Sequence, residues 1–309
     1  MTFTKRWLLV GAVLLAVVCV VGWRYRKLVV YATYITFDNS GCKILDVLTA
    51  KANLDTGDSL QEKLRSQSRR IRSDPDGYQL WDTPDGKYWD LKAGTVISVL
   101  SEQARNIYTN SPSQSIRPGD VVFDCGASIG VFTRKALKLG AKKVIAVEPA
   151  PESLICLRRN FEAEIRDGTV IVVAKGVYDH EGQMSFLDMK DNPMGSRFLT
   201  NPDPRIAPQT APLLITTIDK LVAELGLTRV DFIKMDIEGS ERYALKGAEQ
   251  TLKRFHPRMA ICTYHLPDDP TAVPAVVESF GAGYRRQCGA CSITSISGGH
   301  FRPSVMFFN

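Results

Sequence analysis

The chain has 309 residues, of which 44% are hydrophobic and 23% charged, and its formal net charge is +6. This composition excludes a disordered chain and suits one large or two ordinary globular domains with a sizeable core. The charge is modest, and neither zinc-finger spacing nor arginine–aromatic interleaving supports a nucleic-acid partner. The seven cysteines are odd in number and widely spread. We therefore expect reduced cysteines in a domain that faces the cytosol, rather than the disulfide framework of a small secreted protein.

Residues 1–27 have the pattern of a membrane anchor. An uncharged apolar run from Trp7 to Trp23 lies between basic residues on both sides. Its length is at the short end of what spans a bilayer as a helix, and tryptophan favours both interfaces. The alternatives are a cleaved signal peptide, which lacks an A-x-A site here, and a buried core helix. We predict a retained, single-pass transmembrane helix.

Residues 28–115 form an extension with less informative sequence. Residues 63–72 are basic, which we interpret as a solvated helix face, with contact to anionic headgroups as the alternative. Large side chains alternate over residues 78–91 around a Pro-Asp-Gly turn and predict a β-hairpin. Residues 95–110 then predict an amphipathic helix that leads into the main domain.

From residue 116 to residue 309 the sequence predicts a doubly wound α/β domain. The apolar strand Val121–Phe123 is followed by a glycine-containing turn and then by a helical pattern. This order is the nucleotide cradle of open α/β sheets. In the turn, Gly126 would let the backbone approach a ligand, and Gly130 would let the helix pack on the strand.

Asp124 stands where the dinucleotide fingerprint G-x-G-x-x-G has its first glycine. A carboxylate at this position would repel a pyrophosphate and would suit a cationic ligand. This favours S-adenosylmethionine, with its amino group and its sulfonium, over a nicotinamide dinucleotide.

Further cofactor contacts are predicted at the ends of the next two strands. Glu148 and Pro149 follow the apolar strand Lys143–Val147, where an acidic residue can accept both ribose hydroxyls. The segment after the third strand is where an adenine edge would lie. The predicted cofactor-binding residues are Asp124, Gly126, Ser128, Gly130, Glu148, Pro149, Gly176 and Val177.

Three candidate catalytic residues follow two later strands. Asp236 and Glu238 come after the apolar run Val230–Met235, and His265 comes after Met259–Tyr264, so all three should face the crevice above the sheet. Methyl transfer to a hydroxyl needs an in-line geometry and a group that takes the proton. We expect His265 or Asp236 to be the general base and Glu238 to orient the substrate. A structural histidine and a helix N-cap at Asp236 are the alternatives.

We predict no metal site. Asp236, Glu238 and His265 together could hold an ion, but no local ligand spacing demands one. Near the C-terminus, the C-x-x-C pair Cys288 and Cys291 is interpreted as the turn of a terminal hairpin rather than as a zinc or redox pair.

Four segments, in this order, resemble the FkbM family of S-adenosylmethionine-dependent methyltransferases. They are Arg117–Phe161, Val177–Phe186, Thr216–Val222 and Val230–Leu252, and the last contains the block KMDIEG. The resemblance implies a Rossmann-like class I methyltransferase fold with a mostly parallel seven-stranded sheet and helices on both faces. It also implies an antiparallel hairpin at the sheet's end, which Tyr284–Cys288 and Ser304–Phe308 would form. Family members are usually O-methyltransferases that act on sugars, polyketides or lipids.

The sequence thus predicts a membrane-anchored, S-adenosylmethionine-dependent O-methyltransferase. Its acceptor is expected to be a small molecule, glycan or lipid, bound by a loop at residues 184–210. The membrane is the other predicted partner, and no nucleic acid is expected. Because S-adenosylmethionine is a cytosolic metabolite, the catalytic domain should face the cytosol. A nicotinamide-dependent oxidoreductase and a non-catalytic membrane-tethered binding protein remain as alternatives.

Overall fold

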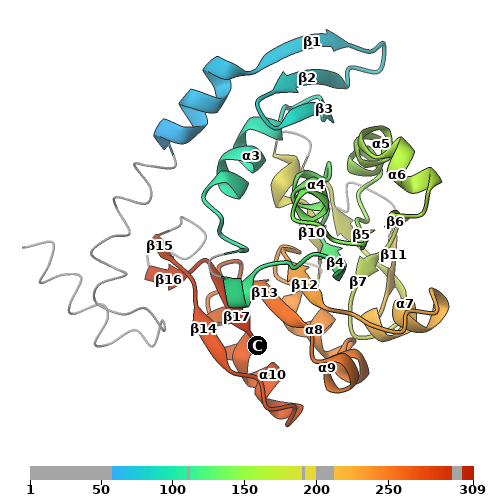
Figure 1. Cartoon of the computed structure of the whole chain (residues 1–309), viewed down its shortest axis with the longest axis vertical. Helices are drawn as coiled ribbons and strands as arrows, with labels where there is room; N and C mark the ends of the chain where they lie inside the picture. Colours follow the sequence, from blue (N-terminus) through green and yellow to red (C-terminus); the bar gives the residue numbers. More distant parts are fainter. Residues whose placement is uncertain (1–57, 110–111, 190–191, 200–211, 294–300) are drawn as a thin grey trace, which may run out of the picture.

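The computed structural model describes residues 58–109, 112–189, 192–199, 212–293 and 301–309 (Figure 1). The predicted anchor at residues 1–27 lies outside the described residues. Among the residues that are described, no helix has the length and apolar character needed to cross a bilayer.

A seven-stranded sheet lies at the centre, in the order β14-β17-β13-β12-β4-β5-β6 (Figure 1). The five strands from β13 to β6 are parallel, and β17 runs antiparallel to both of its neighbours. The fold is therefore a class I methyltransferase-like α/β fold with a mixed sheet, and the predicted terminal hairpin is confirmed. The strands are β4 (Val121–Cys125), β5 (Lys143–Val147), β6 (Val170–Val173), β12 (Phe232–Met235), β13 (Arg258–Cys262), β14 (Arg286–Cys288) and β17 (Val305–Phe308).

Both faces of this sheet are covered, which explains why its central strands are apolar throughout. Along β4, Phe123 belongs to the apolar cluster on one face and Val122 to the cluster on the other. Helices α4 and α5 pack on the Val122 side, and helices α7 to α10 pack on the Phe123 side. The helices are α4 (Val131–Lys138), α5 (Pro151–Asn160), α6 (Glu162–Arg166), α7 (Ile218–Glu224), α8 (Glu241–Lys246), α9 (Glu249–Phe255) and α10 (Asp269–Ser279).

The described part of the extension forms a three-stranded antiparallel sheet, a helical segment at residues 58–67 before it and a helix after it. The strands β2 (Gln79–Thr83) and β3 (Gly86–Asp90) confirm the predicted hairpin. Helix α3 (Val96–Ala104) confirms the predicted helix over its first part, and residues 105–108 form turns instead. The helix prediction for the basic run is wrong over its second half, because β1 (Arg69–Ser73) is a strand that pairs with β2. Its side chains are exposed, as a solvated face requires.

The extension shares a core with the sheet domain. The Asn160 side chain at the end of α5 accepts a hydrogen bond from the Trp89 amide at 2.6 Å. It also donates to the Trp89 carbonyl at 2.9 Å and to the Ile129 carbonyl at 2.8 Å. The Arg134 guanidinium of α4 lies 3.9 Å from the ring centre of buried Tyr88. These contacts fix the hairpin and α3 against α4 and α5.

Shorter elements complete the domain. Strands β7 (Gly176–Val177), β8 (Gly182–Met184) and β11 (Leu213–Thr216) form one small sheet, and β9 (Phe186–Leu187) pairs with β10 (Arg197–Phe198). Two 3-10 turns, η1 and η2, cover Pro112–Gln114 and Pro193–Gly195.

The C-x-x-C pair lies inside an arm of the terminal hairpin rather than at its turn. Cys288 ends β14, which pairs with β17, and Cys291 begins β15 (Cys291–Ile293), which pairs with β16 (Phe301–Pro303). Cys291 is disulfide-bonded, so the expectation of reduced cysteines is wrong for Cys291.

Candidate active site

A cleft opens above the carboxyl ends of β4, β5 and β12, where ligands bind in open α/β sheets. Six of the predicted cofactor residues line it, namely Gly126, Ser128, Glu148, Pro149, Gly176 and Val177. Asp236 and Glu238 line it as well, whereas Asp124, Gly130 and His265 do not. The extension contributes to the same cleft through α3, whose Val99, Glu102 and Gln103 face it.

The turn after β4 needs its glycines for internal packing. Gly126 has φ +78°, and a Cβ there would run into the carbonyl oxygen of Asp236. Gly130 has φ +92° at the start of α4, and a Cβ there would run into the ring of Phe161. Gly130 therefore lets α4 pack against the segment after α5, and Gly126 lets two cleft loops pass each other closely.

Asp124 does not face the cleft. It is fully buried, one of its carboxylate oxygens accepts a hydrogen bond from Thr133 Oγ1 at 2.7 Å, and the other lies 3.3 Å from Lys234 Nζ. The prediction that Asp124 selects a cationic ligand is wrong, because a buried ammonium already balances its charge.

Lys234 is the residue that the sequence interpretation missed at this point. Its Nζ also donates to the Gly126 carbonyl at 2.8 Å, so it links β12 to the turn after β4. Burial acts to lower the pKa of Lys234, but the carboxylates of Asp124 and Asp236 raise it above its usual value. Lys234 is therefore a fixed positive charge. A lone lysine within an apolar strand is the signal that could have found it.

Glu148 ties two cleft loops together. It is buried, and its two carboxylate oxygens accept from the amides of Ser128 and Ala150, both at 2.8 Å. Burial raises the pKa of Glu148 to about 7, against the opposing effect of these two amides. Each oxygen keeps a second lone pair that can accept from a ligand hydroxyl.

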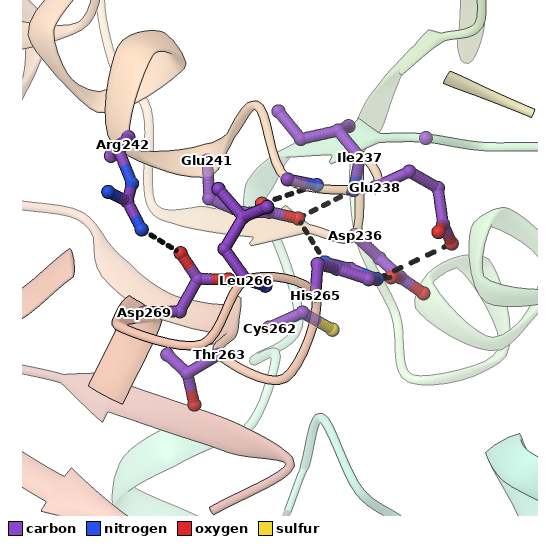
Figure 2. A network of polar contacts seen from close by, with 12 residues as sticks. Asp236, Ile237, Glu238, Glu241, Arg242, Cys262, Thr263, His265, Leu266 and Asp269 are labelled. Atoms are coloured by element: carbon purple, nitrogen blue, oxygen red, sulfur yellow. Dashed lines mark hydrogen bonds and ion pairs between the residues drawn. The ribbon is translucent and has the colours of Figure 1, made fainter. Parts of the chain in front are cut away.

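His265 lies behind the cleft in a cluster of carboxylates (Figure 2). Its Nδ1 is 2.9 Å from Glu241 Oε1, and its Nε2 is 3.3 Å from Asp236 Oδ1 and 3.4 Å from Glu238 Oε1. Burial acts to lower the pKa of His265, but these three carboxylates raise it well above its usual value. The side chain is therefore an imidazolium, which has no lone pair to take a proton, so the general-base role predicted for His265 does not fit this geometry.

Glu241 holds the loop between β12 and α8. It is fully buried, and its carboxylate accepts from the amides of Ile237 and Gly239 at 2.9 and 3.0 Å. The loop needs this support because Glu238 has φ +54°, a conformation that is costly for a residue with a side chain. Ligand atoms of Asp236, Glu241 and His265 lie within 4.8 Å of one another, close enough to hold a metal ion. We interpret them as an ion-pair cluster, because the Glu241 oxygens already bind two amides and the imidazolium.

Asp236 connects this cluster to the extension. One of its oxygens accepts from the Tyr108 hydroxyl at 2.7 Å, and the same hydroxyl lies 2.7 Å from Glu102 Oε1. Burial acts to raise the pKa of Asp236, but His265, Lys234 and Tyr108 hold it below its usual value. A carboxylate that is so strongly stabilised as the anion is a weak base. Neither Glu102 nor Tyr108 belongs to the predicted site.

The far wall of the cleft is built by the segment that was expected to form the acceptor pocket. Its lining residues are Phe186, Pro193, Met194, Ser196, Arg197 and Phe198. The Phe198 ring packs so closely on Gly176 that a Cβ at Gly176 would collide with it. This wall is mainly apolar, with the Arg197 guanidinium as its one charged group among the described residues.

The model of the methyltransferase FkbM domain family matches residues 124–288, which is just over half of the chain. The chain belongs to the FkbM methyltransferase family. The match covers the turn after β4, the Glu148 loop and the loop between β12 and α8, and it begins after α3. The predicted family is thus confirmed, and membership supports the predicted S-adenosylmethionine-dependent methyltransferase.

Individual relatives of this family member share only part of their length with it. The 31-O-demethyl-FK506 methyltransferase FkbM of Streptomyces tacrolimicus is 32% identical over 161 residues, which is 43% of this chain and 61% of that protein. The ribosomal protein L11 methyltransferase of Burkholderia orbicola is 25% identical over 130 residues, or 38% and 43% of the two chains. A crystal structure of a methyltransferase FkbM from Methylobacillus flagellatus aligns with 20% identity and a TM-score of 0.46, over 70% of this chain and 52% of that one.

Proposed function

We propose that this protein is an S-adenosylmethionine-dependent O-methyltransferase that acts on a hydroxyl of a sugar, glycolipid or polyketide-like acceptor. The observation that carries the proposal is the cleft, in which the FkbM-family loops after β4, β5 and β12 meet around Glu148, Asp236 and Glu238.

The cleft has the charge and the free polar groups that a cationic methyl donor needs. Glu102, Glu148, Asp236 and Glu238 line it against only two cations among its described lining residues, and one of these, Lys234, is already paired with buried Asp124. The Ser240 hydroxyl is buried in this cleft without a hydrogen-bond partner among the described residues. A bound ligand would supply the missing partner.

Bound S-adenosylmethionine would supply a methyl group activated by the sulfonium. The turn Gly126–Ser128 and the Glu148–Pro149 loop would hold its nucleoside and amino-acid parts, with Glu148 accepting from the ribose hydroxyls. Gly176 and Val177 would lie against the adenine. Glu238 would orient the acceptor hydroxyl so that its oxygen lies in line with the methyl group, about 3 Å away.

The acceptor would rest on the wall formed by Phe186, Pro193, Met194 and Phe198. Apolar and aromatic side chains pack against sugar or lipid carbon atoms, and Arg197 can donate to oxygen atoms. The name of the Streptomyces relative describes a 31-O-demethyl acceptor, so oxygen receives the methyl group in that protein. We propose that the atom methylated by this protein is also an oxygen.

We also propose a membrane location, with the catalytic domain on the cytosolic side. The apolar run from Trp7 to Trp23, with its basic flanks, supports an anchor, and a lipid or glycolipid acceptor would be within reach of an anchored enzyme. Reporter fusions at the C-terminus test the orientation, and activity of the reporter only outside the cytosol would contradict it.

Two measurements separate this function from its alternatives. Calorimetry with S-adenosylhomocysteine and with NAD should show binding of the first and none of the second, and the reverse result would favour an oxidoreductase. Tritiated S-adenosylmethionine should then label a membrane extract from cells that lack the protein. Cofactor binding without label transfer would indicate a non-catalytic binding protein.

A matched pair of variants tests whether the binding measured by calorimetry takes place in the cleft. Glu148→Gln should weaken S-adenosylhomocysteine binding, whereas Glu249→Gln, which removes an exposed carboxylate on α9, should not.

A further inference from the structure

The Tyr108 hydroxyl lies between two carboxyl groups but has only one proton. Glu102 Oε1 and an Asp236 oxygen are each 2.7 Å from it, a distance at which two oxygen atoms need a hydrogen between them. If Tyr108 donates to one carboxylate, the other carboxyl group must itself donate to the Tyr108 oxygen. The arrangement in the structure therefore contains two protons, one on the phenol and one on a carboxyl group.

The surrounding charges determine which carboxyl group carries that proton. Asp236 lies 3.3 Å from the His265 imidazolium and is further stabilised as an anion by the charge of Lys234. Within the described part of the chain, Glu102 forms no ion pair and is half-buried at the edge of the cleft. The proton therefore rests on Glu102, which donates to Tyr108 while Tyr108 donates to Asp236.

We propose that Glu102 is the general base that deprotonates the acceptor hydroxyl, and that Tyr108 and Asp236 position its carboxyl group. This inference rests on the proposed O-methyltransferase function and names the proton acceptor for it. The hydrogen-bonded arrangement in the structure is then the protonated form of the base, as it stands after a methyl transfer.

The reaction moves a proton to Glu102 and a methyl group to the acceptor oxygen. The acceptor O–H bond breaks and its proton goes to the Glu102 carboxylate, while the acceptor oxygen forms a bond to the methyl carbon. The S–CH3 bond breaks and its electron pair stays on sulfur. The products are a methyl ether, S-adenosylhomocysteine and protonated Glu102, which returns its proton to solvent through the open side of the cleft.

The environment of Glu102 suits this role. Burial and the Asp236 charge raise the pKa of Glu102 to about 7, while the Tyr108 hydrogen bond and the charges of Lys234 and Arg105 oppose them. A base works best when its pKa is near the working pH. Asp236 is too weak a base and His265 has no free lone pair, whereas Glu102 can exchange a proton near neutrality.

Glu102 and Tyr108 lie outside the matched family region, which begins at residue 124. Helix α3 places Glu102 in the cleft, and the segment after α3 carries Tyr108 beneath it. The proposed general base therefore comes from the extension and not from the family domain.

The experiment compares Glu102→Gln with wild-type protein, using tritiated S-adenosylmethionine and a membrane extract from cells that lack the protein. We expect kcat to fall by about 100- to 10,000-fold, with KM and the affinity for S-adenosylhomocysteine little changed. Wild-type kcat should rise as the pH passes about 7, and the variant should lose this limb of the profile. Glu164→Gln, which removes a half-buried carboxylate on α6 outside the cleft, is the control and should retain the full rate.

Tyr108→Phe provides a readout that a purely structural role would not produce. Once Glu102 has lost its proton, the Tyr108 hydroxyl donates to the resulting anion and stabilises it. The loss of this donor should therefore shift the pH limb upward, with a smaller fall in kcat than in Glu102→Gln. A Glu102→Gln variant that keeps both the rate and the pH limb would overturn the proposal.

A failure of the proposed methyltransferase function would give a different result from a failure of the Glu102 assignment. Wild-type protein that binds S-adenosylhomocysteine but labels nothing would remove the methyltransferase activity and this role with it. Infrared difference spectra then test the shared proton alone. The spectra are recorded in a Glu148→Gln background, because the pKa of Glu148 is also raised to about 7. In that background the C=O band of a protonated carboxyl group should disappear as the pH passes about 7, and the added substitution Glu102→Gln should remove this band. Persistence of the band in the double variant would contradict the assignment of the proton to Glu102.

Discussion

Two regions border the cleft, and they hold their ionisable side chains differently. In the family region, Lys234 faces Asp124, and His265 faces Glu241, Asp236 and Glu238, so that each charge is balanced where it is buried. In the extension, Glu102 has the Tyr108 hydroxyl as its partner and, within the described residues, no ion pair. The comparison indicates that the part of the sheet edge formed by β12 and β13 provides fixed charges, and that the extension provides a group whose protonation can change.

The first prediction has the largest expected effect and concerns a fixed charge. Lys234→Met leaves the Asp124 carboxylate fully buried without its cation, which should lower the free energy of unfolding by about 3–5 kcal/mol. Urea denaturation measures this change. The double variant Asp124→Asn, Lys234→Met should recover much of the loss. If Lys234→Met unfolds at the wild-type urea concentration, Lys234 does not balance a buried charge at the sheet edge.

The second prediction concerns the contact between the two regions. Asn160→Ala removes three hydrogen bonds that join α5 to β3 and to the start of α4, and should cost about 2–3 kcal/mol. Urea denaturation followed by tryptophan fluorescence reports on it, because Trp89 is one of the partners. Gln79→Ala, which removes one exposed hydrogen bond in the same hairpin, is the control. Equal effects of the two variants would show that the regions are held together elsewhere.

The third prediction concerns the cofactor side of the cleft. The pKa of Glu148 is raised to about 7, so its carboxylate is ionised above that pH and protonated below it. Ligand hydroxyls donate better to the ionised form, and wild-type affinity for S-adenosylhomocysteine should therefore rise as the pH passes about 7. Glu148→Gln should lower the affinity about tenfold above this pH and abolish the pH dependence. Calorimetry at several pH values tests this, and a pH dependence that survives in the variant would assign it to another group.

The smallest effect is expected at the surface of the extension. Lys138 of α4 and Asp85 of the hairpin turn form an ion pair at 2.7 Å, with 52% and 36% of their side chains exposed. Lys138→Met should change the free energy of unfolding by less than about 1 kcal/mol, and less at high salt. This loss is to be compared with that of Lys234→Met, in which the ion pair is buried. A large loss in Lys138→Met would mean that the hairpin depends on this pair and not on its buried core.

The sequence predicted the fold well because the signals are local. Strand β5 has the predicted bounds, and the hairpin of β2 and β3 has its predicted turn, since apolar runs and the Pro84-Asp85-Gly86 sequence specify these elements without reference to the rest of the chain. The basic strand β1 was missed because its pairing with β2, and not its composition, determines its conformation.

The candidate site was predicted only in part, because some of its contacts join residues that are far apart in the sequence. Ligands of open α/β sheets bind at the carboxyl ends of the strands, and the sequence shows which residues follow each strand. This was enough to find Glu148, Asp236 and Glu238. The partner of Asp124 was not found, because it lies on another strand. Tyr108 and Asp236 are 128 positions apart, and no local pattern indicates that they share a hydrogen bond.

The position of α3 has a practical consequence for work on this protein. A gene cut at residue 116, the boundary that the sequence indicates, would encode every strand of the central sheet and every loop of the family match. The shortened polypeptide would nevertheless lack one side of its cleft and would expose the apolar side chains of Ile129, Val131 and Cys156 to water. The encoded protein should therefore begin upstream of residue 58, the first described residue of the helical segment that precedes β1.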